Sequence, residues 1–145
     1  MKRNAIRLSG AHEWSVYVIL ALIFASGAIW AWVQHFGKVT SEFGVTLHPA
    51  EIWMQRLHGA AAMLALVLLG SLLLSHIFRA WRAGRNRRTG MSLASILGFL
   101  IGTGYALYYA GNEQLRAWAS WGHLWVGLAL PLIVALHVWR GKQSR

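Results

Sequence analysis

Four long apolar segments without a charged residue constrain the fold of this chain more than any other feature. They cover residues 14–33, 57–78, 91–110 and 117–139. Each is close to the roughly 20 residues that a helix needs to cross the hydrocarbon core of a bilayer. Because 57% of the 145 residues are hydrophobic and only 12% are charged, these segments exceed what the core of a soluble domain of this size can hold. The sequence therefore predicts one all-α domain over residues 1–145, an integral membrane four-helix bundle in a lipid bilayer.

The distribution of charge predicts the orientation of this bundle. Residues 1–13, 79–90 and 140–145 hold eleven Lys and Arg and one Glu, whereas the first and third loops hold three basic and three acidic residues. Lys and Arg concentrate on the cytoplasmic side of membrane proteins. We therefore expect both termini and the middle loop in the cytoplasm, and a multi-pass protein of the bacterial inner membrane. This pattern accounts for the net charge of +10 without nucleic acid as a partner.

Histidines within the apolar segments are the candidate functional residues. His58 and His76 lie in the second segment, and His123 and His137 lie in the fourth. Ionisable side chains at such positions are costly in a bilayer and usually serve a function. The sequence has no cysteine, which excludes iron–sulfur clusters held by thiolates, covalently attached haem and thiol nucleophiles. Any metal chemistry must therefore depend on histidine.

The spacing of the histidines predicts two levels of ligands. At about 100° and 1.5 Å per residue, His123 and His137 fall within roughly 40° of each other and about 21 Å apart along one helix. His58 and His76 are separated by five whole turns and share a face, with His58 at the depth of His123 and His76 at the depth of His137. His12, just before the first segment, is a further candidate for the inner level. Paired imidazoles at two levels suit bis-histidine ligation of two b-type haems, whereas zinc needs three or four converging ligands.

Two arginines lie beside the outer histidine level. Arg56 precedes His58 closely, and Arg116 precedes His123. Both are suited to pair with haem propionates, and the alternative interpretation is that they are positive charges at the membrane interface. His35 and His48 fall in the first loop, where we interpret them as solvated side chains.

Three passages resemble a known family, the bacterial four-helix di-haem cytochromes b. The passages are GAHEWSVYVILALIFASG, RLHGAAAMLALVL and GHLWVGLALPLIVALHVWRG. The family includes a superoxide:quinone oxidoreductase and the membrane subunits of formate dehydrogenases and nickel-iron hydrogenases. The resemblance implies that His58 and His123 hold the outer haem. It also implies that His12 and His137 hold the inner haem, for which His76 is the alternative fourth ligand.

Two haems at different depths would allow electrons to pass from one face of the membrane to the other. We therefore expect transmembrane electron transfer between a quinone pool and a periplasmic redox partner, such as a dehydrogenase subunit, or a small oxidant or reductant. Because histidine would fill both axial positions of each iron, oxygen binding is not expected. An oxidoreductase that acts alone and an electron-transfer subunit both stay open. The alternative function is a membrane scaffold or assembly subunit whose histidines only join helices by hydrogen bonds.

Overall fold

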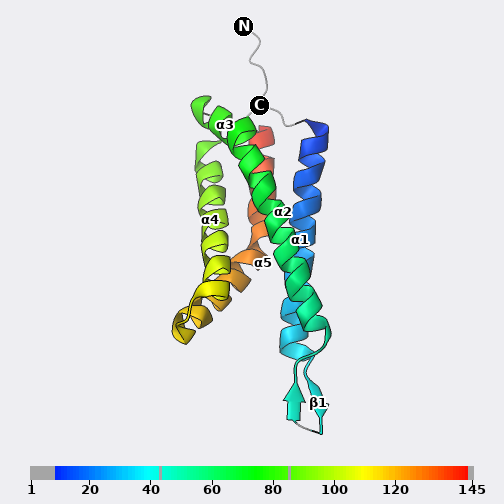
Figure 1. The fold of residues 1–145 in the computed structure, drawn as a ribbon. Coiled ribbons are helices and arrows are strands. Elements are labelled where there is room, and N and C mark those ends of the chain that lie inside the picture. The colour runs from blue at the N-terminus through cyan, green and yellow to red at the C-terminus, as the bar shows by residue number, and fades with distance from the viewer. Residues whose placement is uncertain (1–8, 43, 85, 144–145) are drawn as a thin grey trace. The chain divides into compact units, whose positions relative to one another are not determined.

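The computed structural model describes residues 9–42, 44–84 and 86–143, and helices make up most of this part of the chain (Figure 1). Within it, four helical stretches are long and apolar enough to cross a membrane: Gly10–Phe36, Ala50–Arg82, Arg87–Tyr109 and Glu113–Gln143. The prediction of an all-α chain with four helices of spanning length is therefore confirmed. Each of these stretches begins before the corresponding predicted apolar segment, because the helix also includes charged residues that precede that segment.

The described residues divide into two compact units. The first unit, residues 9–72, contains α1 (Gly10–Phe36), β1 (Val39–Ser41), β2 (Gly44–Thr46) and α2 (Ala50–Leu72). The second unit, residues 73–143, contains η1 (Leu73–Ile77), α3 (Phe78–Arg82), α4 (Arg87–Tyr109) and α5 (Glu113–Gln143).

In the first unit, α1 and α2 lie side by side and are connected through the β1–β2 hairpin (Figure 1). The hydroxyl of Ser9 caps α1 by accepting a hydrogen bond from the His12 N–H at 3.3 Å. Such a cap satisfies one of the backbone donors that a helix start leaves without a partner. At the start of α2, the Ala50 N–H donates to Nδ1 of His48 at 3.1 Å, so His48 has a local structural role.

In the second unit, α4 and α5 lie side by side (Figure 1). Oδ1 of Asn112 caps α5 by accepting from the Leu115 N–H at 2.9 Å, which places the helix start at Glu113. The helix continues through Pro131. Proline has no N–H for the carbonyl four residues earlier and its ring crowds that residue. Here the earlier residue is Gly127, whose lack of a side chain reduces the crowding.

A π-helical turn, η1, interrupts the second apolar segment and contains His76. The sequence-based expectation treated residues 57–78 as one regular α-helix. A π-helical turn has hydrogen bonds from i to i+5, so the residues after its start point in directions that an unbroken α-helix would not give them. The prediction that His58 and His76 share one face assumed an unbroken α-helix between them, whereas the regular α-helix ends at Leu72, before His76.

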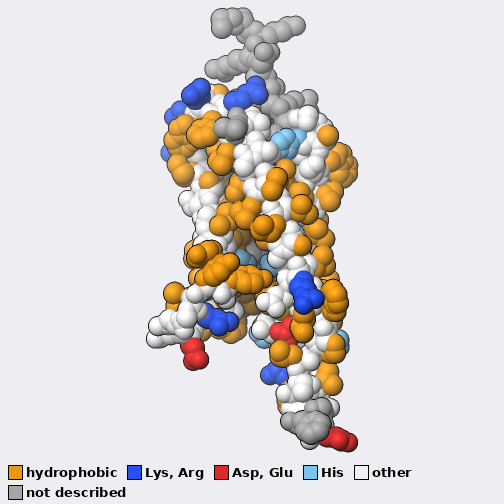
Figure 2. Space-filling view, viewed as in Figure 1, with side chains coloured by type: hydrophobic (Ala, Val, Ile, Leu, Met, Phe, Trp, Pro, Cys, Tyr) orange, Lys and Arg blue, Asp and Glu red, His pale blue; other side chains and the backbone are white. Residues whose placement is uncertain are grey.

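Apolar side chains are exposed along the helices of both units (Figure 2). Among the described residues, the buried hydrophobic side chains are Ala61, Ala119 and Leu130. By contrast, Val67 and Leu132 are 75% and 74% exposed. Exposed apolar surface of this extent is typical of proteins that contact a membrane or a partner. Lys and Arg side chains gather where α3 ends and α4 begins (Figure 2).

Candidate functional site

The predicted ligand histidines are distributed over both units. His12 on α1 and His58 on α2 belong to the first unit. His76 in η1, together with His123 and His137 on α5, belongs to the second unit. Each of the two pairs that the resemblance implies therefore takes one histidine from each unit, and the pairing stays a prediction.

His58 contacts a buried hydroxyl on the neighbouring helix. Its Nδ1 lies 3.1 Å from Oγ of Ser26 on α1. The Ser26 side chain is 2% exposed, and its hydroxyl donates to the Ile23 carbonyl at 3.1 Å. Ser26 is the only buried polar residue among those that the structure describes. The ring of His58 is therefore held against α1 through its Nδ1 side.

His123 has an equivalent contact in the second unit. Its Nδ1 lies 2.9 Å from Oγ1 of Thr103 on α4. The Thr103 hydroxyl also donates to the Phe99 carbonyl at 2.8 Å. A hydroxyl that bonds the carbonyl one turn earlier is a common arrangement for Ser and Thr inside helices. In this case the same oxygen also orients an imidazole of the adjacent helix.

His137 has the third contact of this kind. Its Nδ1 lies 3.1 Å from Oγ1 of Thr89, in the first turn of α4. The Thr89 hydroxyl donates to Oδ1 of Asn86 at 2.6 Å, and Nδ2 of Asn86 donates to the His137 carbonyl at 3.1 Å. The N-terminus of α4 is thus connected to α5 beside His137.

A glycine follows each of the three hydroxyl residues and faces the same histidine ring. A Cβ added at Gly27 would lie 2.8 Å from Cε1 of His58, closer than real Cβ contacts allow. At Gly104 it would lie 3.5 Å from Cε1 of His123, and at Gly90 it would lie 3.7 Å from Cε1 of His137. The ring edge that carries Cε1 therefore packs against the backbone of the neighbouring helix in all three cases.

His12 is held differently. Its Nε2, not its Nδ1, lies 3.0 Å from a hydroxyl, Oγ of Ser71 on the last turn of α2. The Ser71 hydroxyl donates to the Leu68 carbonyl at 2.7 Å. The sequence pattern gave no indication of this contact, which joins residues 59 positions apart.

Trp30 adds a hydrogen-bond donor beside His58. The two ring centroids are 6.0 Å apart, and the ring planes are inclined by 50°. Nε1 of Trp30 is buried and has no hydrogen-bond partner within the described part of the chain. Buried Trp N–H groups usually have a partner, so a group bound beside His58 would find a donor there.

The remaining candidates of the sequence analysis lie at helix ends. The guanidinium of Arg56 stacks over the Trp53 ring at 5.3 Å, and Arg116 is exposed in the first turns of α5. His35 is exposed in the last turn of α1, where Nδ1 lies 2.8 Å from the Ala31 carbonyl.

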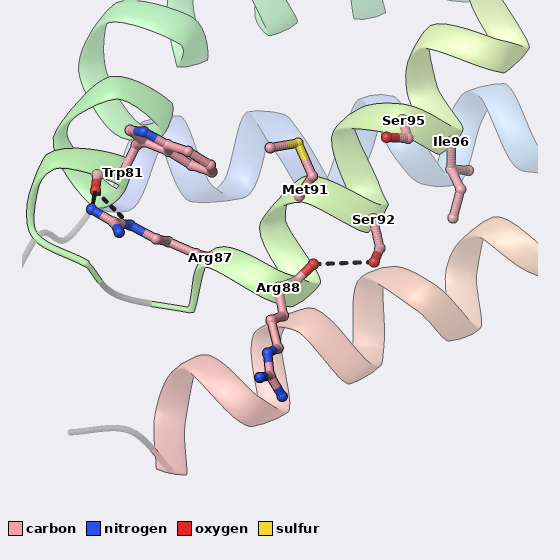
Figure 3. Close-up of a pocket in the computed structure, with 7 residues that line it drawn as sticks. All are labelled: Trp81, Arg87, Arg88, Met91, Ser92, Ser95 and Ile96. Carbon is pink, nitrogen blue, oxygen red and sulfur yellow. Dashed lines mark hydrogen bonds between the residues drawn. The ribbon is translucent and has the colours of Figure 1, made fainter.

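A basic pocket lies where α3 ends and α4 begins (Figure 3). It has a volume of about 700 Å³ and is lined by Trp81, Arg87, Arg88, Met91, Ser92, Ser95 and Ile96. Arg87 donates to the Trp81 carbonyl at 2.8 and 3.0 Å and stacks over the Trp81 ring (Figure 3). In the first turn of α4, Thr89 therefore contacts His137, whereas the neighbouring Arg88 lines this pocket.

No group of three or more His, Cys, Asp or Glu side chains that could hold a metal ion occurs in residues 9–42, 44–84 and 86–143. Iron in a haem needs only two protein ligands, whereas a structural zinc site needs four. The three hydroxyl contacts and Trp30 were not identified from the sequence. The signal that could have indicated the hydroxyls is the glycine that follows each of them, at residues 26–27 and 103–104 within apolar segments and at residues 89–90 at the end of the basic middle loop.

The fold and site together define a class: an all-helical chain with four helices of membrane-spanning length and histidines inside three of those helical stretches. No model of a known protein family matches the chain, and no curated protein or solved structure matches it. The resemblance to the di-haem cytochromes b therefore depends on the three passages of the sequence and on the histidine spacing.

Proposed function

We propose that this chain is a membrane cytochrome b that transfers electrons across the bacterial inner membrane through two non-covalently bound b-type haems. One observation carries the proposal: His58, His123 and His137, all inside helices of spanning length, each turn Nδ1 towards a hydroxyl of the adjacent helix. Histidines that bind metals through one nitrogen almost always have the other nitrogen hydrogen-bonded, which orients the ring. The arrangement is the one expected of metal ligands.

The residues present fit a haem. The buried Trp30 N–H, without a partner among the described residues, is a donor for a carboxylate beside His58. His58 and His123 would hold the outer haem, with Arg56 and Arg116 available to its propionates. His137 would hold the inner haem with His12, or with His76 as the alternative. When bound, the haem iron supplies one-electron transfer, and the absence of cysteine means that the haems are not covalently attached.

The partners follow from the orientation that the charges favour. The basic residues of the tails and the middle loop favour an orientation with both termini in the cytoplasm. Electrons would then pass between a quinone or quinol and a periplasmic redox protein, a dehydrogenase subunit or a small oxidant or reductant. The resemblance to the di-haem cytochromes b supports the same set of partners. Whether the chain is itself an oxidoreductase or a subunit of one depends on which partner it has.

A membrane scaffold is the second candidate, and the same contacts favour it. The Ser26–His58 bond joins α1 to α2, and the Thr103–His123 bond joins α4 to α5. Hydrogen bonds between membrane helices contribute about 0.6 to 2 kcal/mol each, so such bonds alone are a sufficient reason for histidine in a scaffold. A scaffold would have no Soret absorbance.

Haem content of the purified protein tests the proposal. Protein extracted from membranes should have two haems per chain by the pyridine haemochrome assay, both low-spin and removable by acidified solvent. The His35→Ala variant is the matched control, because His35 is an exposed histidine at a helix end. It should retain both haems. One haem per chain would contradict the two-level arrangement, and none would favour the scaffold.

A further inference from the structure

We infer that three Ser/Thr–Gly dipeptides are positioning residues that fix the tautomer and the direction of a histidine ring before the ring binds a metal. We call them the hydroxyl–glycine clamps: Ser26–Gly27 for His58, Thr103–Gly104 for His123 and Thr89–Gly90 for His137. In each clamp the ring carries its proton on Nδ1 and has its lone pair on Nε2. The inference rests on the proposed function, since a lone pair on Nε2 is what a metal requires.

The hydroxyl proton determines the tautomer. A Ser or Thr hydroxyl has one proton to donate and two lone pairs to accept with. The Thr89 hydroxyl lies 2.6 Å from Oδ1 of Asn86 but 3.1 Å from Nδ1 of His137. Nδ2 of Asn86, which can only donate, also lies near Nδ1 of His137, but this distance of 3.5 Å is longer than its 3.1 Å bond to the His137 carbonyl. The Thr103 hydroxyl lies 2.8 Å from the Phe99 carbonyl and 2.9 Å from Nδ1 of His123. When the proton goes to the oxygen acceptor, the hydroxyl can only accept from the ring, so Nδ1 must carry a hydrogen.

Ser26 has the same two contacts and a buried position. Its hydroxyl lies 3.1 Å from the Ile23 carbonyl and 3.1 Å from Nδ1 of His58. The carbonyl is the acceptor that a helical serine bonds most readily, because it lies on the preceding turn of the same helix. His58 Nδ1 then donates to Ser26, as in the other two clamps.

The glycine determines how closely the ring approaches. At Gly27 the position of an added Cβ would be 2.8 Å from Cε1, 3.2 Å from Nδ1 and 3.7 Å from Nε2 of His58. The Nδ1–Cε1 edge therefore faces α1, and Nε2 is the ring nitrogen farther from it. At Gly104 the order is the same, with Cε1 of His123 at 3.5 Å and Nδ1 at 3.9 Å. A side chain in place of Gly27 would displace the ring and break its bond to Ser26.

His12 provides an internal contrast. Ser71 contacts Nε2 of this ring and donates its own proton to the Leu68 carbonyl at 2.7 Å. By the same reasoning His12 carries its proton on Nε2. Gly70, next to Ser71, has no atom within 4 Å of an added Cβ, so no glycine packs against the His12 ring there. The contacts of the described residues thus include three clamps that engage Nδ1 and the Ser71 contact, which engages Nε2.

The Thr103→Val variant tests the clamp on His123, because it preserves the shape of the side chain and removes the hydroxyl. Thr103→Ser keeps the hydroxyl and is the conservative rescue. The measurement uses full-length protein that is labelled with ¹⁵N-histidine and whose haem iron is reduced. The Nδ1–H of His123 should exchange slowly with solvent in the wild type and in Thr103→Ser. It should exchange faster in Thr103→Val. The reduction potential of the outer haem should rise only in Thr103→Val, because the ligand loses a bond that increases its basicity.

Equal exchange and equal potential in all three proteins would overturn the inference. A wild type without haem would refute the proposed function but not the clamp, because the tautomer of His123 is then read directly from its ¹⁵N spectrum. In that case an Nε2–H signal for His123 would overturn the clamp, and an Nδ1–H signal would support it.

The glycines give a second, steric test. Gly27→Ala should reduce the occupancy of the outer haem, whereas Gly98→Ala should not, because an added Cβ at Gly98 meets nothing within 4 Å. Gly104→Ala and Gly90→Ala should have small effects, because their contacts of 3.5 and 3.7 Å are ordinary ones. Equal haem content in Gly27→Ala and Gly98→Ala would overturn the role of the glycine.

Discussion

At the scale of single residues, the hydroxyl contacts differ in which ring nitrogen of histidine they engage. Three of them meet Nδ1, whereas Ser71 meets Nε2 of His12. If Nε2 is the atom that binds iron, His12 must exchange its bond to Ser71 for a bond to the metal. The alternative ligand, His76, lies in the same unit as His137. The fourth ligand is therefore either His12, which must first release Ser71, or His76.

We predict that His12→Ala has a large effect on the inner haem and His76→Ala a small one, as the resemblance of the first helix implies. Loss of the true ligand leaves iron five-coordinate or bound to water, so the inner haem becomes high-spin or dissociates. Ser71→Ala should leave both haems low-spin, because it removes the competitor for Nε2 of His12 and not the ligand. Optical and electron paramagnetic resonance spectra of the purified variants measure these changes.

Ser15→Ala is the matched control for Ser71→Ala, because the Ser15 hydroxyl bonds only the Ala11 carbonyl among the bonds described for it. Its spectra should equal those of the wild type. A large change in His76→Ala with an unchanged His12→Ala would assign the fourth ligand to His76. The proposal of two haems would survive that result.

At the scale of helices, hydropathy predicted the four spanning stretches but not their ends. A helix that crosses the hydrocarbon core requires about 20 consecutive apolar residues, so an apolar run of this length is a strong signal. Helix ends depend instead on local hydrogen bonds, such as the cap from Asn112 that starts α5 at Glu113 instead of residue 117. The turn η1 has no distinctive residue pattern, so periodicity alone did not predict it.

The histidines of the candidate site were predictable, whereas their partners were not. A histidine in an apolar run is conspicuous because of its cost there. Ser26 and Thr103 are not, since a hydroxyl inside a helix usually bonds its own backbone. Their contacts join residues 32 and 20 positions apart and depend on how two helices pair. Only the pairing of α1 with α2 and of α4 with α5 showed which hydroxyl meets which ring.

The start of α4 gives a prediction about stability. Asn86 has φ = 49°, in the left-handed region, and bonds both Thr89 and His137. Both Asn86→Gly and Asn86→Ala lose these bonds, but only alanine has a Cβ that crowds the following carbonyl in this conformation. We expect Asn86→Ala to be less stable than Asn86→Gly by about 1 to 2 kcal/mol. Thermal unfolding in detergent measures the difference, and equal melting temperatures would show that the residue does not keep this conformation.

At the scale of the whole molecule, the proposed haems would link the two units. His58 belongs to residues 9–72 and His123 to residues 73–143, so an outer haem bound by both has one axial ligand from each unit. A ligand that binds only the folded chain stabilises it by about 4 kcal/mol when present at 1,000 times its Kd. Loss of the outer haem should therefore lower the stability of the folded chain.

This dependence makes the pairing testable with single substitutions. We predict that His58→Ala and His123→Ala lose the same haem, so that their reduced-minus-oxidised spectra are identical and their melting temperatures fall together. His137→Ala should lose the other haem and leave the outer spectrum intact, because its clamp, Thr89–Gly90, is separate from those of His58 and His123. If His58→Ala instead matched His137→Ala, the outer pair would be wrong. The two units would then be linked through His58 and His137, and His123 would need a different partner.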